Sequence, residues 1–294
     1  MNPAPGPLKV PPELDNLVRS ALREDIGRGD LTTRVLFREA LPAEGRVIAR
    51  QDLVISGIDV LKGVFSHLDP SLSVRSFRRE GERVSAGDIL ATIQGDGRRI
   101  LTGERVALNF IQHLSGVATL TASYVEALKE FKARLLDTRK TLPGLRVLEK
   151  RAVRAGGGLN HRMGLDDAIL IKDNHIALHG SIGKAIRTAR ENAPPLSRVL
   201  VEARSIEQVD EAVSEGAHWI LLDNMTTDQL RTAVERIKGR AETEASGGAS
   251  LENLRAIAST GVDYISAGRI THSAPAADIS LDLIPLSKGG KSSP

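Results

Sequence analysis

Residues 198–223, RVLVEARSIEQVDEAVSEGAHWILLD, contain the unit that decides the fold. One apolar run ends in Glu202 and a second ends in Asp223. Between them, Ser205 is followed three positions later by a glutamine, which is the capping-box spacing that starts a helix. Gly216 then stands where a helix end needs a left-handed residue. The stretch therefore predicts a strand, a helix and a second strand parallel to the first.

The same pattern recurs through the second half of the chain. Thr226 and Ser250 predict two further helix starts, and Gly239 and Gly261 predict the ends of those helices. Short apolar runs bounded by polar residues occupy 134–137, 168–172, 198–202, 219–223, 241–245 and 262–266. We interpret these runs as buried strands of one parallel sheet.

The spacing of the acidic residues supports a regular repeat. Glu202, Asp223 and Glu244 are each 21 positions apart, which predicts that every unit returns the chain to the same level of the sheet. Right-handed crossovers then favour a barrel or a doubly wound sheet. In both folds the carboxyl ends of the strands lie at one edge, so we expect the functional site there, with Asp137 among its residues.

The chain before residue 103 has a different pattern. Strand-like runs at 45–50, 72–77 and 88–93 predict a small β-rich domain. Residues 103–130 have helical periodicity, with Arg105 on the polar side and Gly116 predicting a break or a bend before a second helix. We predict three regions. Residues 1–115 form an N-terminal domain with a flexible proline-rich arm at 1–12, residues 116–274 form a barrel, and residues 275–294 form a segment that returns to the first domain.

The composition excludes several functional classes. Hydrophobic residues make up 41% and charged residues 26% of the 294 residues, which is an ordinary globular balance. Aromatic residues make up only 3%, which argues against a base-stacking surface for single-stranded nucleic acid. The chain has no cysteine, and this excludes disulfides, thiolate metal sites and a cysteine nucleophile.

The charge and the termini indicate a cytoplasmic protein that binds small anions. The net charge is +3, and the basic residues are dispersed rather than gathered in one tail. This distribution suits small anionic substrates better than a DNA backbone. No apolar run approaches the roughly 18 residues of a membrane helix, and the N-terminus lacks a signal-peptide pattern. We therefore expect no membrane association and no nucleic-acid partner.

Cations and acids gather at the predicted strand ends. The basic residues are Arg139, Lys140, Arg162 and Lys172. Because the planar fork of arginine can bind a carboxylate through two hydrogen bonds, the set suits a compact ligand with several negative charges. Glu202 and Asp223 end apolar strands, so each carboxylate is paired with a nearby cation or holds Mg2+. The sequence leaves structural ion pairing and catalysis equally open for these two acids.

Glycine-rich segments follow the last two predicted strands. They are Ser246-Gly247-Gly248 and Ala267-Gly268. Glycines allow backbone N–H groups to approach an anion, and phosphate sites after late strands are usual in βα barrels. These segments are our candidates for a phosphate site.

Seven motifs in order resemble the quinolinate phosphoribosyltransferase family, also called carboxylating nicotinate-nucleotide diphosphorylase. They lie at residues 137–146, 157–162, 171–175, 201–202, 222–224, 244–248 and 265–268, and the resemblance runs from about Glu24 to Asp282. It implies an α/β fold, in which an incomplete parallel TIM-like barrel follows an N-terminal α+β sandwich. It also implies a homodimer in which Arg105 reaches the partner's active site. Leu142 departs from the family pattern, which commonly has a threonine there.

The resemblance also implies roles for the candidate residues. Arg139, His161, Arg162 and Lys172 would bind the two carboxylates of quinolinate, and Lys140 would contact phosphate or substrate. Glu202 and Asp223 would face the ribose and Mg2+–pyrophosphate. Ser246, Gly247, Gly248, Ser266, Ala267 and Gly268 would hold the 5′-phosphate.

The implied reaction joins quinolinate to phosphoribosyl pyrophosphate (PRPP). Its products would be nicotinate mononucleotide, pyrophosphate and CO2, with Mg2+ as the cofactor. The nearest alternative is a related transferase that uses nicotinate or another small ring acid. A non-catalytic phosphate-ligand sensor and a nucleic-acid-binding protein are more distant alternatives. The clustered acids and cations argue against the sensor, and the scarce aromatics argue against nucleic-acid binding.

Overall fold

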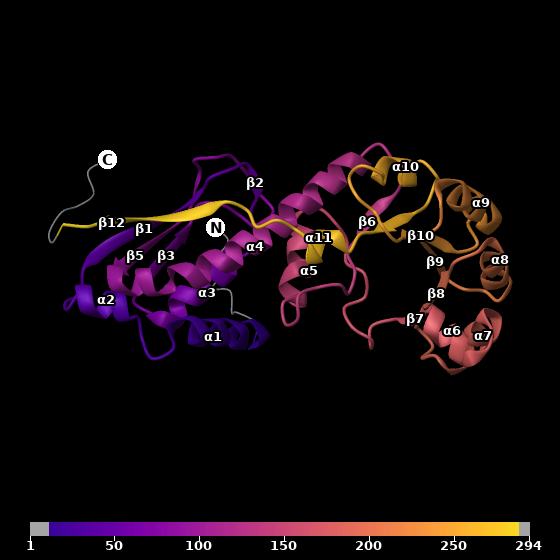
Figure 1. Ribbon diagram of the computed structural model, residues 1–294, viewed down its shortest axis with the longest axis horizontal. Helices are drawn as coiled ribbons and strands as arrows, with labels where there is room; N and C mark the ends of the chain where they lie inside the picture. Colours follow the sequence, from indigo (N-terminus) through magenta and orange to yellow (C-terminus); the bar gives the residue numbers. More distant parts are fainter. Residues whose placement is uncertain (1–11, 288–294) are drawn as a thin grey trace, which may run out of the picture. The chain divides into compact units, whose positions relative to one another are not determined.

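A computed structural model describes residues 12–287 and divides them into two compact units. Unit 1 comprises the described residues up to Thr119 together with those from Pro275 onward, and unit 2 comprises Leu120–Ala274. The arm predicted at 1–12 and the end of the returning segment, 288–294, lie outside the described residues except for Pro12. Figure 1 shows the elements of each unit.

Unit 1 contains an antiparallel sheet of four strands in the order β12-β1-β5-β3. Their bounds are β1 Pro42–Ala49, β3 Ser73–Ser76, β5 Ile89–Asp96 and β12 Ile279–Pro285, and a separate two-stranded sheet pairs β2 Leu53–Val54 with β4 Arg83–Val84. The side chains of β1 alternate between exposed or half-buried and fully buried positions, so one face of the sheet is covered. The three predicted strand runs are confirmed, and the segment after residue 274 supplies an edge strand paired with β1.

Helices complete unit 1 as an α+β sandwich (Figure 1). They are α1 Pro12–Ile26, α2 Leu31–Leu36, α3 Ile58–Leu68 and the unit 1 part of α4 Gly97–Leu128. The first three were not predicted from the sequence, although Ile58, Leu61 and Phe65 of α3 lie one helical turn apart and are buried. Within residues 12–287, no helix is both long and apolar enough to cross a bilayer.

The helix break predicted at Gly116 is wrong. α4 continues through this residue for 32 residues without interruption. A Cβ atom at Gly116 would lie 2.0 Å from the carbonyl oxygen of Pro275, so only glycine allows this close approach. The glycine is present for a tertiary contact with the returning segment and not to end the helix.

Unit 2 is an incomplete parallel α/β barrel. Six strands form one parallel sheet in the order β6-β11-β10-β9-β8-β7, so the strands at the two edges do not pair with each other. The strands are β6 Arg134–Leu136, β7 Ile169–Ile171, β8 Val199–Ala203, β9 Trp219–Asp223, β10 Glu242–Ser246 and β11 Tyr264–Ser266. An isolated parallel bridge from Leu136 to Leu159 extends the β6 edge. All six predicted strand runs are confirmed.

Helices follow the strands and lie on the outer side of the curved sheet (Figure 1). They are α5 Arg146–Ala155, α6 Asp173–His179, α7 Ile182–Asn192, α8 Ile206–Ser214, α9 Thr227–Ile237, α10 Leu254–Ala258 and α11 Arg269–His272. Leu170, Leu200 and Leu221 of three neighbouring strands form an apolar cluster, against which Trp219 packs.

The predicted helix boundaries are mostly confirmed. Ser205 and Thr226 accept hydrogen bonds from the third helical N–H group of α8 and α9, as the capping spacing predicted. The glycines that follow three helices have positive φ angles: Gly216, Gly239 and Gly261. The helix start predicted at Ser250 is wrong, because α10 begins at Leu254. The Ser250 N–H instead donates to the side chain of Asn253 in the preceding turn.

The strand register corrects the level at which the acids were predicted. Glu202 and Glu244 are both aligned with Leu221 of β9. Asp223 therefore lies two residues farther along, level with Ser246. Since neighbours in register face the same side of a parallel sheet, the three acids share one face at two depths. Equal spacing in sequence did not give equal depth, because the loops between strands differ in how they return the chain.

Candidate active site

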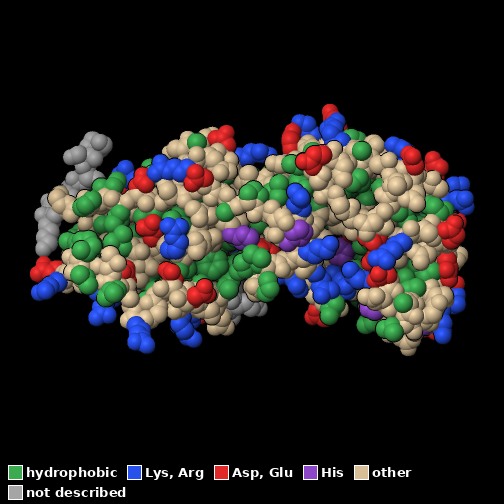
Figure 2. All heavy atoms as spheres, in the orientation of Figure 1, with side chains coloured by type: hydrophobic (Ala, Val, Ile, Leu, Met, Phe, Trp, Pro, Cys, Tyr) green, Lys and Arg blue, Asp and Glu red, His purple; other side chains and the backbone are tan. Residues whose placement is uncertain are grey.

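The carboxyl edge of the sheet in unit 2 carries most of the predicted site residues. Figure 2 shows Lys and Arg side chains gathered on one face of this unit, with His side chains beside them. The loop after β6 carries Arg139 and Lys140, the segment after α5 carries Arg162, and Lys172 directly follows β7. β6 and β7 are the two edges of the open barrel, and the charge of Arg139 acts on Arg162, so the segments after β6 and α5 lie close together.

Arg139 and Arg162 lie close enough to repel each other. Burial lowers the pKa of the Arg162 guanidinium, and the charge of Arg139 lowers it further. One Arg162 nitrogen donates to the carbonyl of Ala168 at 2.8 Å. The Nε atom of Arg139 is buried and has no hydrogen-bond partner within residues 12–287. Two neighbouring guanidiniums with an unfilled donor form a site that an anion would stabilise.

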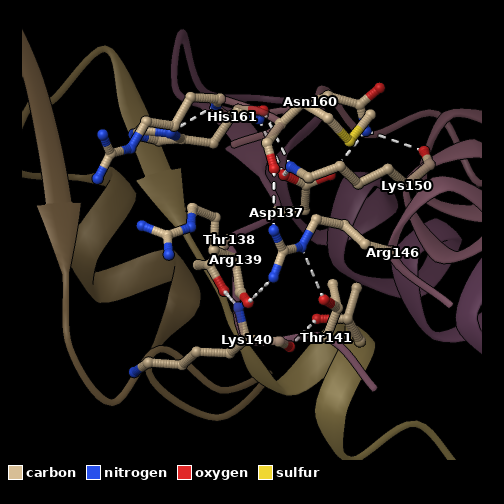
Figure 3. Close-up of polar contacts among 12 residues, drawn as sticks. Asp137, Thr138, Arg139, Lys140, Thr141, Arg146, Lys150, Asn160 and His161 are labelled. Atoms are coloured by element: carbon tan, nitrogen blue, oxygen red, sulfur yellow. Dashed lines mark hydrogen bonds and ion pairs between the residues drawn. The ribbon is translucent and has the colours of Figure 1, made fainter. Parts of the chain in front are cut away.

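The sequence predicted Asp137 among the residues of the open edge, but its carboxylate does not line that edge. Its side chain is fully buried and contacts the ammonium of Lys150. The Asn160 amide donates to its second oxygen at 2.6 Å, and the His161 N–H donates to its first at 2.9 Å. Burial raises the pKa of Asp137, while the Lys150 ammonium, the Asn160 amide and the His161 N–H oppose that rise. The buried carboxylate of Asp137 therefore holds Lys150, Asn160 and His161 together (Figure 3).

Lys150 is a residue that the sequence analysis missed. It lies on α5, and its ammonium also donates to the carbonyl oxygen of His161 at 2.9 Å. The sequence did carry one signal: a carboxylate at the end of a buried strand needs a buried partner. With 40 lysines and arginines in the chain, however, the sequence could not identify which cation was that partner.

The loop between β6 and α5 is fixed by the first turn of that helix. Arg146 donates to the Thr141 hydroxyl at 3.0 Å and to the carbonyl of Met163 at 3.1 Å. The buried carboxylate of Glu149 accepts the N–H of Leu142 at 3.2 Å. Leu142 therefore contributes its backbone, and its side chain is 42% exposed.

Both ring nitrogens of His161 face protein groups. Nδ1 accepts the N–H of Arg162 at 2.7 Å, which leaves Nε2 to donate to a second group. Nε2 lies 3.5 Å from Oε2 of Glu244, a fully buried carboxylate that also accepts the indole N–H of Trp219 at 2.8 Å. The indole stacks on Tyr264 with a centroid distance of 4.4 Å. These contacts orient His161, and its predicted contact with a substrate carboxylate stays a prediction.

Three acids converge on one arginine at the ends of β7, β8 and β9. Arg204 lies 2.9 Å from Asp173, 3.3 Å from Glu202 and 3.2 Å from Asp223. Lys172 lies 3.9 Å from Glu202. Burial raises the pKa of Glu202, and repulsion from Asp223 and Asp173 raises it further, against the effect of Lys172 and Arg204. Arg204 and Asp173 were not among the predicted residues, because their importance depends on the strand register.

Glu202 and Asp223 have the ligand chemistry that Mg2+ requires, but two carboxylates are too few to coordinate the ion by themselves. Carboxylate oxygens are the ligands that Mg2+ prefers, and Glu202 and Asp223 supply them from adjacent strands. Within residues 12–287, no three His, Cys, Asp or Glu side chains are placed to hold a metal together. These residues therefore fit Mg2+ that brings further oxygen ligands with it, as a diphosphate does.

The glycine segments present free backbone donors. Within residues 12–287 the N–H groups of Gly247, Gly248 and Gly268 have no acceptor. Ser266 and Ala267 are buried, and the N–H of Ala267 donates to the carbonyl of Leu136 at 3.0 Å. Three glycine amides therefore remain as phosphate donors, whereas the helix after Gly268 has only four residues and adds little dipole.

Lys140 belongs to the same part of the site as the second glycine segment. A Cβ atom at Gly268 would lie 3.0 Å from Cδ of Lys140 and 3.2 Å from the ring of His272. The backbone carbonyl of Lys140 accepts the Thr271 hydroxyl at 2.7 Å. In Figure 3 its side chain extends away from the Asp137 contacts, and within the described residues its ammonium has no partner.

A cavity of about 640 Å³ lies beside the two predicted diacid ligands His161 and Arg162. Leu136, Leu200 and Trp219 form part of its apolar wall. It extends to residues 196–198, which precede β8. The cavity therefore opens toward the amino ends of β7, β8 and β9, and Arg139, Lys172, Glu202 and Asp223 do not line it.

Arg105 is the one predicted site residue outside unit 2. It lies on α4 in unit 1, and its side chain is exposed, as the helical pattern predicted. Its action in a partner's site stays a prediction.

Two family models match most of the chain. Residues 30–115 match the model described as quinolinate phosphoribosyl transferase, N-terminal domain, and residues 117–282 match the corresponding C-terminal domain. The probable nicotinate-nucleotide pyrophosphorylase (carboxylating) of Synechocystis sp. is 45% identical over 288 residues, which span 96% of this chain and 97% of that protein. The Mycobacterium leprae nicotinate-nucleotide pyrophosphorylase (carboxylating) is 46% identical over 275 residues, 90% of this chain and 95% of that protein.

Solved structures agree with the sequence relatives. The crystal structure of NadC from Streptococcus pyogenes is similar with a TM-score of 0.90 and 42% sequence identity, covering 95% of this chain and 99% of that one. A nicotinate-nucleotide pyrophosphorylase from Pyrococcus furiosus has a TM-score of 0.69 at 18% identity, which extends the likeness of fold alone.

Proposed function

Because the chain belongs to the quinolinate phosphoribosyltransferase family, we propose that the carboxyl edge of its barrel is the site of this transfer. The chain is a pentosyltransferase that moves the phosphoribosyl group of PRPP to quinolinate with decarboxylation. The products are nicotinate mononucleotide, pyrophosphate and CO2, and the reaction belongs to the de novo synthesis of NAD.

The observation that carries the assignment of the site is the pair Arg139 and Arg162. A partly buried guanidinium beside a second one is destabilising unless an anionic group lies between them. The buried, unpaired Nε of Arg139 supplies a donor for such a group. A diacid meets both requirements, whereas nicotinate has one carboxylate. We therefore assign the two carboxylates of quinolinate to Arg139 and Arg162, with Lys172 and His161 beside them.

The acids at the ends of β8 and β9 are assigned to the sugar. As the bond from C1′ to pyrophosphate breaks, positive charge develops on the ribose ring while the quinolinate nitrogen attacks C1′. A carboxylate fixed near that charge stabilises the transition state more than the ground state. Glu202 and Asp223 are held at adjacent strand ends by Arg204, which supports this role.

Loss of CO2 follows from the bond that has formed. The ring nitrogen becomes a pyridinium, and its positive charge stabilises the electron pair that is left when the bond between C2 and its carboxylate breaks. The electron pair remains at C2 and is then protonated. The protein's part is to hold the departing carboxylate in place, which the arginine pair would do.

The phosphate and metal contacts complete the proposal. Gly247, Gly248 and Gly268 would donate to the 5′-phosphate with Lys140 beside them, since their N–H groups are free. Glu202 and Asp223 would hold Mg2+, which neutralises charge on the pyrophosphate leaving group. A homodimer with Arg105 contributed across the interface, and a cytoplasmic location, remain part of the proposal on the basis of the sequence.

The test measures the formation of nucleotide and of CO2 with quinolinate and with nicotinate as substrates. Purified protein with PRPP and Mg2+ is given quinolinate labelled in its C2 carboxylate, and nucleotide formation and labelled CO2 are followed together. We expect equal amounts of mononucleotide and CO2 from quinolinate, and little turnover of nicotinate. Efficient turnover of nicotinate, or nucleotide formation without CO2, would contradict the proposal.

A further inference from the structure

Two basic residues of α5 connect the chain segments that carry the arginine pair. On the basis of the proposed function, we infer that Lys150, assisted by Arg146, is a positioning residue for the diacid. It fixes the distance between the guanidiniums of Arg139 and Arg162. That distance determines the preference for two carboxylates over one.

The first connection is the ammonium of Lys150, whose side chain is 1% exposed. It contacts the carboxylate of Asp137, two residues before Arg139. It also donates to the carbonyl oxygen of His161 at 2.9 Å, one residue before Arg162. One buried cation therefore joins the chain on the N-terminal side of both arginines.

The second connection lies one helical turn earlier on α5. Arg146 donates to the hydroxyl of Thr141, two residues after Arg139, at 3.0 Å. It also donates to the carbonyl of Met163, one residue after Arg162, at 3.1 Å. Each of the two arginines therefore lies between two positions that are attached to the same helix.

Packing alone does not account for these charged contacts. α5 already buries Leu148, Ala152 and Val153. Burying an ammonium and a carboxylate carries a large desolvation cost, which their attraction does not always recover. The Asp137 carboxylate also accepts from the Asn160 amide and the His161 N–H. The pair of Asp137 and Lys150 therefore holds the β6 loop to residues 160–161.

The expected consequence is specific to diacids. A displacement of about 1 Å in a binding group can cost on the order of 100-fold in rate. A diacid needs both guanidiniums at a fixed spacing, whereas a monoacid needs only one of them. Loss of the Lys150 connection should therefore weaken quinolinate binding more than nicotinate binding, and should hardly alter PRPP binding.

The test uses a double variant, because Lys150→Met alone would leave the Asp137 carboxylate buried and unpaired. Asp137→Asn with Lys150→Met removes both charges and keeps similar side-chain volumes. We expect this variant to fold, with the KM for quinolinate raised about 10- to 100-fold and the KM for PRPP within about twofold. Calorimetric titration of the enzyme with quinolinate and with nicotinate should show the ratio of the two affinities falling toward one.

The matched control is Thr243→Val, a buried substitution in the same barrel. It removes the hydrogen bond from the Thr243 hydroxyl to Asp263 at 2.6 Å, away from both arginine segments. It should lower the melting temperature and leave the affinity ratio unchanged.

The outcomes separate this inference from the proposed function. If the wild-type enzyme does not turn over quinolinate, the proposed function fails. Two outcomes with an active wild type would show that the positioning role of Lys150 is wrong. In the first, the folded double variant keeps the wild-type ratio of quinolinate to nicotinate affinity. In the second, it loses quinolinate and PRPP binding equally.

Discussion

Glu202, which we propose stabilises the transition state, lies where its charge reduces the stability of the folded protein. It is the penultimate residue of β8 and is 7% exposed, with Asp223 and Asp173 nearby. Burial and these like charges raise its pKa, so the ionised form is disfavoured in the folded protein. Residues at active sites often carry such a penalty, because stability and activity place different demands on the same side chain.

The substitution Glu202→Gln should therefore have opposite effects on activity and stability. We expect turnover to fall by about 100- to 1000-fold, because a charge that stabilises the transition state is removed. The folded protein binds the Glu202 proton more tightly than the unfolded chain does, so its contribution to the unfolding free energy is present at acid pH and is lost as pH rises through the raised pKa. The melting temperature of the variant should equal that of the wild type at acid pH and exceed it near neutrality.

The control for this measurement is Glu207→Gln on α8. Glu207 is exposed, and a hydrogen bond from Ser205 lowers its pKa, so its contribution is present above its ordinary pKa and is lost as pH falls. Glu207→Gln should have a lower melting temperature than the wild type near neutral pH, with no loss of turnover. A Glu202→Gln enzyme that is active, or that is less stable than the wild type at neutral pH, would contradict the interpretation.

Helix α4 shows how a tertiary contact changes the meaning of a residue. By propensity, Gly116 weakens a helix by about 1 kcal/mol relative to alanine. In the structure the helix is continuous, and the glycine accommodates the carbonyl of Pro275. Propensity and packing therefore predict opposite signs for the same substitution.

Gly116→Ala should destabilise unit 1. A methyl group placed 2.0 Å from the Pro275 oxygen must displace the returning segment, and overpacking of this kind costs about 1–3 kcal/mol. The matched control is Gly63→Ala in α3, where the nearest atom is a methyl of Val18 at 3.8 Å. There we expect a gain of up to about 1 kcal/mol from helix propensity. Urea unfolding at one fixed protein concentration measures both free energies, and equal signs for the two variants would contradict the steric argument.

The whole molecule divides its proposed site residues between two units. Arg105 lies in unit 1, and the other candidates lie in unit 2. This division is compatible with an active site that takes Arg105 from a partner subunit, which the family resemblance implies. It also makes the assembly testable by mixing inactive enzymes.

Arg105→Ala and Glu202→Ala should each abolish most of the turnover in a homodimer. If Arg105 acts across the interface, a hybrid dimer has one site that lacks both groups and one site that has both. Unfolding and refolding a 1:1 mixture should then restore up to about a quarter of wild-type activity, since half of the dimers are hybrids with one intact site. Refolded single variants serve as controls, and a mixture no more active than these controls would exclude the shared site.

The sequence by itself determined the repeating architecture and the chemical character of the site. Apolar runs, capping residues such as Ser205 and Thr226, and left-handed glycines act over a few neighbouring positions, so they can be recognised without the fold. Parallel strands bring their carboxyl ends to one edge, which is why Arg139, Lys172, Glu202 and Asp223 could be assigned to it. The ordered motifs then indicated the family that the comparisons show.

Only the tertiary structure decided which partners these residues have. Lys150 faces Asp137, Arg204 lies among three acids, and Asp223 is two residues farther along the sheet than Glu202. Each of these facts depends on strand register and on contacts between segments far apart in the chain. Local sequence patterns carry no information on that geometry, because many cations compete for each acid and a shift of one residue in register would exchange them.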